Sequence, residues 1–292
     1  MRVIKITLFL FVVLVAATTF IACEKKTKEP NHSPKEDDTS QFVGEYEKKI
    51  LLEQFTSEYC SACPGVDRYL DELIATRIPK GKIIRIAYHN CFKNDFLTIP
   101  QLDAYRIFWN SSTTFNPAVM IDRVVYEGTD RPIIDITKCM DTEHPRHGFI
   151  PLYINPALSK MSPVRFDDTH LSVNEKNNIY ALSINGEVDK RYHKDLNKLY
   201  ITAFLVCDKI PAQIKGPIDP LDEHNNAARA VFTPIFGDPL QLADGKFSKR
   251  YEIKLTNDPE TEYIRAVFFV HYYNANDLKQ NEVLQADEAY IQ

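Results

Sequence analysis

The sequence predicts an α/β domain followed by an all-β domain, and three observations support this. A buried-type apolar run leads into a C-x-x-C motif at residue 60, and helical and apolar runs then alternate. Beyond about residue 147 the chain carries alternating runs separated by Asn, Asp, Gly and Pro clusters, without a convincing long helix. With 292 residues, 44% of them hydrophobic and 26% charged, the chain is long enough for two globular domains.

The N-terminus has the pattern of a secretion signal. Arg2 and Lys5 form a short positive region, and an apolar segment over residues 6–17 follows. That segment is too short for a membrane span and leads to Ala22-Cys23, which resembles the processing site of bacterial lipoproteins. We predict a signal peptide over residues 1–22 and a membrane anchor of acyl chains, such as palmitate, on Cys23. The alternative is an ordinary cleaved signal with an incidental cysteine.

Residues 24–45 are polar, charged and nearly free of large apolar side chains, so residues 23–45 are predicted to form a flexible tether. The net charge of −5 gives no basic face, and no nucleic-acid partner is expected. A secreted chain meets an oxidising compartment in which disulfides persist. Five cysteines remain after Cys23, namely Cys60, Cys63, Cys91, Cys139 and Cys207.

The first domain is predicted over residues 46–146 with the order β-α-β-α-β-β-α, a thioredoxin-like α/β/α topology. Pro64 suits the first turn of the first helix, where a missing N–H group costs nothing. Apolar residues at helical spacing after it should face the sheet. The strands are expected at 49–55, 82–89, 118–122 and 123–126, and the helices at 64–78, 101–109 and 131–140.

The periodicity breaks at residues 144–148, which we take as the domain boundary. The second domain, residues 147–292, is predicted to be an antiparallel β-sandwich of the Ig-like kind. Its strands are expected at 164–174, 178–188, 198–207, 247–255 and 263–273.

Cys60 and Cys63 are the main candidates for chemistry. A strand that ends in C-x-x-C, with a helix starting at the second cysteine, places both sulfurs at a positive helix N-terminus, which lowers the pKa of a thiol. Cys60 should be the attacking thiolate and Cys63 the resolving thiol. The alternative is a structural disulfide that only ties the strand to the helix.

Asn116-Pro117 precedes the predicted strand at 118–122. In thioredoxin-like folds a cis-proline opens the strand beside the C-x-x-C, and a cis bond is a realistic option only before proline. We therefore predict a cis Pro117 at the dithiol, with an ordinary trans proline as the alternative. Asn116 and Tyr59, next to the motif, are predicted to contact the substrate.

The chain resembles a family of lipoproteins named after a 28-kDa outer-membrane protein of Gram-negative bacteria. The matching segments span both predicted domains and are residues 52–56, 60–64, 87–89, 224–230 and 282–286. The resemblance implies an outer-membrane lipoprotein with a thioredoxin-like N-terminal half and a β-rich C-terminal half. Three positions depart from efficient thioredoxins, because Ser61-Ala62 separates the cysteines, Tyr59 precedes them, and Gln54 stands where a buried carboxylate is usual. Glu53 is one position out of phase and should face the other side of the sheet.

His89 ends the second predicted strand. Parallel neighbouring strands end at the same sheet edge, so His89 should lie near Cys60 and influence thiolate protonation, or simply pack there. Cys60, Cys63, His89 and Cys91 could also form a tetrahedral zinc site. The H-x-C spacing and the oxidising compartment disfavour zinc, and neither a metal nor a cofactor is predicted.

Three further features are predicted to be structural. Cys91 and Cys139 should lie too far apart to pair. Cys207 follows the apolar alternation of its strand and should be a buried core thiol. The polar cluster around His224, Asn225, Asn226 and Arg229 is more simply a hydrogen-bonded corner than a binding loop.

The leading hypothesis is therefore a lipid-anchored outer-membrane protein that exchanges thiols and disulfides with protein partners. The alternative is a non-catalytic binding or assembly lipoprotein that keeps Cys60–Cys63 as a static disulfide.

Overall fold

The computed structural model describes residues 43–90, 93–110, 116–140, 148–213, 221–255 and 261–292. The predicted signal peptide, Cys23 and most of the tether lie outside these residues. From Gln41 onward the chain forms one compact unit. Among the described residues, no helix is both long enough and apolar enough to cross a bilayer.

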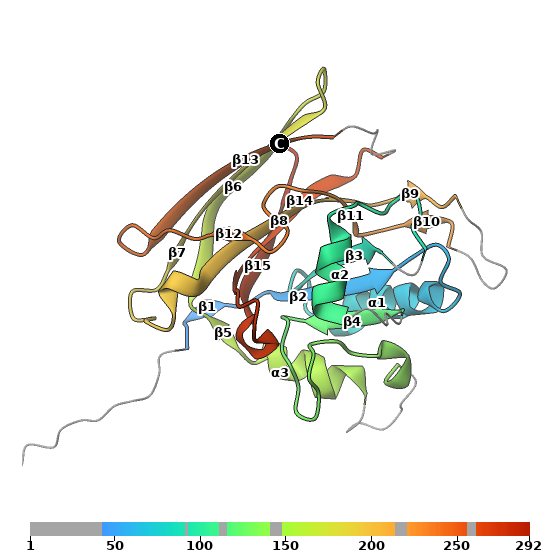
Figure 1. Cartoon of the computed structure of the whole chain (residues 1–292), viewed down its shortest axis with the longest axis horizontal. Helices are drawn as coiled ribbons and strands as arrows, with labels where there is room; N and C mark the ends of the chain where they lie inside the picture. Colours follow the sequence, from blue (N-terminus) through green and yellow to red (C-terminus); the bar gives the residue numbers. More distant parts are fainter. Residues whose placement is uncertain (1–42, 91–92, 111–115, 141–147, 214–220, 256–260) are drawn as a thin grey trace, which may run out of the picture. The chain divides into compact units, whose positions relative to one another are not determined.

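The elements are mostly strands (Figure 1). The strands are β1 (Tyr46–Glu47), β2 (Ile50–Thr56), β3 (Ile83–His89), β4 (Ala118–Ile121), β5 (Met161–Ser162), β6 (Val164–Asn174), β7 (Ile179–Val188), β8 (Leu199–Cys207), β9 (Ile210–Pro211), β10 (Glu223–His224), β11 (Ala227–Val231), β12 (Asp238–Pro239), β13 (Lys246–Lys254), β14 (Ile264–Tyr272) and β15 (Val283–Tyr290). The α-helices are α1 (Cys63–Arg77), α2 (Leu102–Asn110) and α3 (Asn155–Leu158). Single helical turns cover Ile136–Lys138, Ile150–Ile154, Leu196–Lys198 and Leu278–Gln280.

The first half has the predicted thioredoxin-like order as far as β4. Strand β2 pairs in parallel with β3 and antiparallel with β4. Alternate residues of β2 face opposite sides, so Leu52 packs with α1 while Leu51 packs with α2. The two helices therefore cover opposite faces of this part of the sheet.

The predicted strand at 123–126 and helix at 131–140 are wrong. Asp122 and Arg123 have positive φ angles and turn the chain away at the end of β4. In place of the predicted strand, a single antiparallel bridge joins Val119 of β4 to Ile134. Only Ile136–Lys138 forms a helical turn, because Pro132 and the β-branched residues that follow it are poor helix formers.

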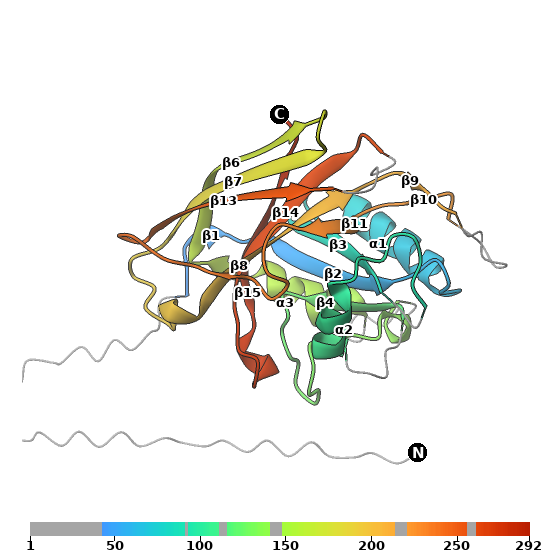
Figure 2. The same cartoon turned by 45° about the horizontal axis from the view of Figure 1, so that its top comes forward.

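The strands of the second half extend the same sheet. Its order is β15-β14-β8-β11-β3-β2-β4, with β12 pairing to β8. The junction is β11, which pairs in parallel with β3 at Ala227 and Ala87 and antiparallel with β8. Figure 2 shows β11 and β3 side by side. The predicted division between residues 146 and 147 falls among residues outside the described part, and it stays a prediction.

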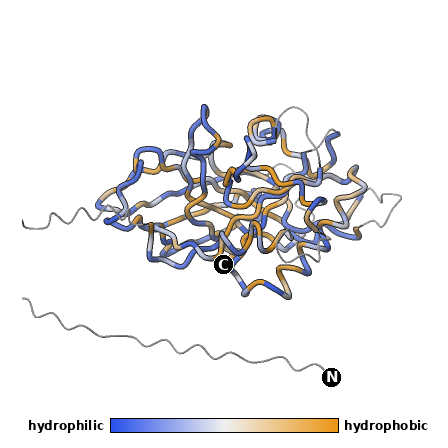
Figure 3. The backbone as a smooth tube through the Cα atoms, turned by 90° about the horizontal axis from the view of Figure 1, so that it is seen from below, coloured by the Kyte–Doolittle hydropathy of each residue, from blue (hydrophilic) through white to orange (hydrophobic). Residues whose placement is uncertain are grey.

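The five strands predicted in the second half agree with β6, β7, β8, β13 and β14 within about one residue. Strands β13, β7 and β6 form a separate antiparallel sheet. It encloses a core with β8 and β14, to which Leu182, Ile201 and Phe268 contribute. Two β layers are therefore present, but an Ig-like sandwich is not confirmed, because one layer continues into the α/β half. Figure 3 shows the apolar stretches concentrated along the central strands.

Cys207 is a fully buried core thiol, as predicted, and burial raises its pKa to about 12. Cys139 is buried as well, with its Sγ 3.5 Å from the Ile136 carbonyl oxygen. Cys91 lies outside the described residues, so the prediction that it does not pair with Cys139 stays a prediction.

Candidate functional site

The Cys60–Cys63 pair lies in the turn between β2 and α1. The Cys60 N–H donates to the Ser57 carbonyl oxygen at 3.1 Å, and the Cys63 N–H donates to the Cys60 carbonyl oxygen at 3.3 Å. The two cysteines form a disulfide. Cys60 is 7% exposed and Cys63 1%, whereas Ser61 and Ala62 between them are exposed. Cys60 is thus the more accessible of the two cysteines, although both are largely buried.

Helix α1 begins at Cys63, as predicted, with Pro64 in its first turn. Its N-cap residue is Ala62, and among the described residues no side chain caps this end. The N–H groups of a first helical turn carry partial positive charge and favour a nearby anion. In the reduced protein this end of α1 can therefore stabilise a thiolate.

The Asn116–Pro117 peptide bond is cis, as predicted. Ala118 pairs with Phe55, so by register Pro117 lies beside Thr56, where β2 leads to the C-x-x-C. Pro117 is buried, and neither amide atom of the Asn116 side chain has a hydrogen-bond partner among the described residues. The register thus places Pro117 beside the last residue of β2; its role at the dithiol and the substrate contacts of Asn116 and Tyr59 remain predictions. The Tyr59 ring lies 3.8 Å from Lys93 Nζ.

His89 lies at the end of β3 on the same edge, as the parallel pairing requires. Its Nδ1 lies 3.0 Å from Asp95 Oδ2, and that oxygen also accepts the Glu58 N–H at 2.9 Å. His89 therefore reaches the dithiol turn through Asp95. Burial alone would raise the pKa of Asp95, but its bonds to His89 and to the N–H groups of Glu58 and Leu97 lower it to about 2.

This lowered pKa predicts acid sensitivity. Because the pKa of about 2 in the folded protein lies below the ordinary value of 3.8, the charged Asp95 stabilises the fold above about pH 5. That contribution, on the order of 2 kcal/mol, is lost as the pH falls toward 2. Urea unfolding at pH 5.5 and pH 2.5 should show a smaller loss for Asp95→Asn than for the wild type. The exposed Asp168→Asn should behave as the wild type, and equal losses in all three proteins would contradict the prediction.

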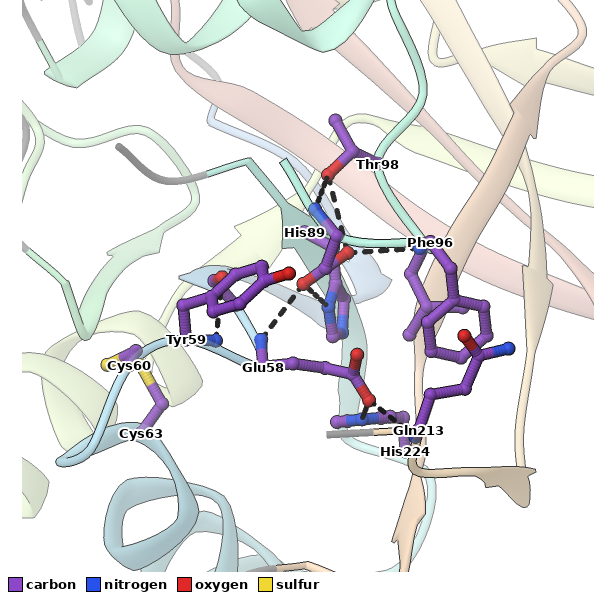
Figure 4. A network of polar contacts seen from close by, with 12 residues as sticks. Glu58, Tyr59, Cys60, Cys63, His89, Phe96, Thr98, Gln213 and His224 are labelled. Carbon is purple, nitrogen blue, oxygen red and sulfur yellow. Dashed lines mark hydrogen bonds and ion pairs between the residues drawn. A yellow bond between two sulfur atoms is a disulfide. The ribbon is translucent and has the colours of Figure 1, made fainter. Parts of the chain in front are cut away.

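Glu58, two residues before Cys60, connects the site to the second half of the chain. Its Oε1 lies 3.0 Å from His224 Nε2 in β10 and accepts the Gln213 N–H at 2.8 Å. The His89 and His224 rings meet edge to face, with centroids 4.9 Å apart. Figure 4 shows the Glu58 side chain pointing toward His224 and Gln213, away from the disulfide. The polar corner predicted around His224 is thus hydrogen-bonded, as expected, and it also reaches the dithiol turn.

Gln54 and Glu53 face opposite sides of the sheet, as predicted. Gln54 bonds to Asp67 of α1 at 3.0 Å and to Arg85 of β3 at 2.5 Å. Glu53 instead binds Arg123, with 2.9 Å from its Oε2 to the Arg123 Nε. A carboxylate on the α1 side is therefore supplied by Asp67, one helical turn after Cys63, rather than by the strand.

A small polar cavity of about 20 Å³ lies between α1, β3 and the β10 region. It is large enough for about one water molecule. Its lining includes Thr56, Asp67, Arg85, His89 and His224. Among the described residues, no group of three or more His, Cys, Asp or Glu side chains is placed to hold a metal ion. Cys91, which the zinc alternative requires, lies outside those residues.

Comparisons with known proteins place the fold. No family model matches the chain, and no curated protein matches it. HBP35 of Porphyromonas gingivalis is 18% identical with a TM-score of 0.67, and the alignment covers 85% of this chain and 76% of that one. HBP35 has a thioredoxin-like fold, so this likeness supports a thioredoxin-like fold for the chain.

Two further solved structures are more distant. A structural-genomics protein from Agrobacterium tumefaciens is 12% identical, with 84% of this chain and 95% of that chain covered and a TM-score of 0.46. A domain of the outer membrane lipoprotein Omp28 from Porphyromonas gingivalis is 12% identical, with 44% of this chain and 88% of that chain covered and a TM-score of 0.30.

Three residues of the site were not among the predicted ones, namely Glu58, Asp95 and His224. Glu58 had a local signal, since it lies two residues before Cys60. Asp95 follows His89 by six residues, within reach of a short loop. His224 lies 166 residues beyond Glu58, and nothing local in the sequence connects the two.

Proposed function

We propose that this protein exchanges thiols and disulfides with extracytoplasmic protein partners through Cys60 and Cys63. The observation that carries the proposal is the placement of the pair. The two cysteines are largely buried, but Ser61 and Ala62 between them are exposed, and the turn precedes a helix N-terminus that no described side chain caps, with Pro117 beside the strand that leads to it. A disulfide with only a stapling role would not need this setting.

The reaction follows from the two sulfurs. In the reduced protein the Cys60 thiolate attacks a partner disulfide, forms a mixed disulfide and releases one partner thiolate. The Cys63 thiol then loses its proton and attacks Cys60 Sγ, which closes the Cys60–Cys63 bond and releases the second partner sulfur. Two electrons pass from the protein to the partner, and the reverse sequence oxidises a partner dithiol.

The direct test is a trapping experiment. In Cys63→Ala the mixed disulfide on Cys60 cannot be resolved, so partner proteins should accumulate as complexes that dissociate on reduction. Cys60→Ala should capture none, and Cys207→Ala, which removes a buried thiol, should behave as the wild type. A trap that stays empty in cells and with a model peptide disulfide would leave the non-catalytic alternative.

The reduction potential separates the two functions in the purified protein. An exchanging pair should lie between about −270 and −120 mV, with Cys60 alkylated before Cys63 near neutral pH. A static disulfide should lie below about −300 mV and react only after unfolding.

The proposal includes an anchor at the outer membrane through lipid on Cys23. It is supported by the signal pattern that ends at Ala22-Cys23 and by the polar segment after it, which suits a tether. Metabolic labelling with palmitate should mark the wild-type chain in the outer-membrane fraction and leave Cys23→Ser unlabelled.

A further inference from the structure

Two carboxylates and two imidazoles form a connected polar network next to the dithiol turn. The Asp95 carboxylate is shared by His89 and the Glu58 N–H, and the Glu58 carboxylate binds His224. The side chains are 2% exposed for His89, 0% for Asp95, 9% for His224 and 1% for Glu58. The network is therefore shielded from solvent. Glu58 precedes Cys60 by two residues, and its side chain extends from the dithiol turn toward His224 (Figure 4).

The His89 and His224 imidazoles lie close enough to interact electrostatically. With ring centroids 4.9 Å apart in a buried site, a charge on one ring opposes a charge on the other. Burial, followed by the neighbouring His89, lowers the pKa of His224. His224 is therefore a neutral imidazole near pH 7 and can accept a proton.

The surroundings of His224 are mostly acidic. Glu58 lies on the dithiol turn, Asp67 and Asp71 on α1, and Asp95 on the loop after β3. Among the described residues that line the cavity beside it, the other charged or titratable groups are Arg85 and His89 of β3 and Glu223 of β10 itself. Arg85 is paired with Asp67 and Asp71 at 2.6 Å and 2.5 Å, which leaves Glu58 and Asp95 as the carboxylates that face the imidazoles.

We propose that His224, together with His89, is a positioning residue of the Cys60–Cys63 centre, and that the imidazole pair takes up the proton that balances a thiolate on Cys60. This inference rests on the proposed function. Without that proton, reduction would add the negative charge of a Cys60 thiolate to a turn that already holds the Glu58 carboxylate. No imidazolium would then offset these two negative charges.

The proton balance is complete. When a partner dithiol reduces the centre, the Cys60–Cys63 bond breaks, a partner disulfide forms, and two electrons pass to the centre. The partner gives up two protons. Cys63 keeps one as a thiol, Cys60 remains a thiolate, and the second proton goes to the imidazole pair.

The test measures the rate at which iodoacetamide alkylates Cys60 in the reduced full-length chain between pH 5 and pH 9. His224→Gln cannot hold the charge, so the Cys60 pKa should rise and the rate at pH 6 should fall about threefold to tenfold. Glu58→Gln removes the opposing carboxylate and should raise that rate. The double variant should return close to the wild type. His170→Gln, at an exposed histidine on β6, is the matched control and should change nothing.

Changes of opposite sign in the Cys60 alkylation rate of the two single variants distinguish a charge effect from a general disturbance of the structure. A general disturbance would change both rates in the same direction. Rates within twofold of the wild type in both, or changes of the same sign, would overturn the inference. The wild-type reduction potential and the Cys63→Ala trap report separately on the proposed function. A reactive wild type with unaltered variants therefore defeats only this inference.

Discussion

Replacing Glu53 with alanine is expected to lower the free energy of unfolding by about 3–5 kcal/mol. The Glu53 and Arg123 side chains are 0% and 1% exposed, and they are joined at 2.9 Å and 3.1 Å. The Tyr88 and Tyr105 hydroxyls also donate to Glu53. Removing the carboxylate leaves a buried guanidinium without its counter-ion, which costs far more than the loss of an exposed pair. Chemical denaturation at pH 7 measures the change.

Two further variants serve as comparisons for Glu53→Ala. Arg250→Ala removes an exposed pair with Glu252 and should cost less than about 1 kcal/mol. Glu53→Leu combined with Arg123→Met removes both charges, and most of the lost stability should return. An alanine variant at position 53 that unfolds like Arg250→Ala would show that the buried pair contributes nothing.

Replacing Leu182 with alanine is expected to destabilise the protein by about 2–5 kcal/mol. The unfolding midpoint of the α/β half is expected to shift by the same amount as that of the second half. Leu182 lies on β7, fully buried between the three-stranded sheet and the main sheet. Trp109, the single tryptophan, lies on α2 in a different core that β2, β3 and β8 share. Since β11 joins the halves, the Trp109 fluorescence and the far-UV circular dichroism should report one common midpoint.

This experiment also tests the predicted division at residue 146. Two independent domains would leave the Trp109 transition in place while circular dichroism revealed a second, weaker transition. Ser172→Ala, on the neighbouring strand β6, serves as a control and should leave both signals within about 0.5 kcal/mol of the wild type.

Local sequence patterns predicted much of the fold. The alternation along β6, β7 and β13 located these strands within about one residue, because one face of each strand is buried and the other is solvated. Strand β11 was not predicted. Its sequence, Ala-Ala-Arg-Ala-Val, has no alternation, and it becomes a strand because β3 and β8 leave a place between them.

The residues of the site also fall into those that local sequence patterns predict and those that they do not. Cys60, Cys63 and Pro117 could be predicted because a motif or a dipeptide indicates each of them. Glu58 and His224 look like ordinary polar residues until the hairpin of β9 and β10 brings them together. Whether a buried carboxylate has a partner depends on the tertiary fold, and no local pattern records that.

The insertion of β11 beside β3 has a consequence for the newly made chain. His224 is 166 residues later than Glu58, so synthesis at about 5–20 residues per second leaves an interval on the order of ten to thirty seconds between them. During that interval the two sulfurs of the motif have been made, but the strand that completes their sheet has not. The surroundings that the pair has in the folded protein can therefore form only after the chain has been made as far as β11.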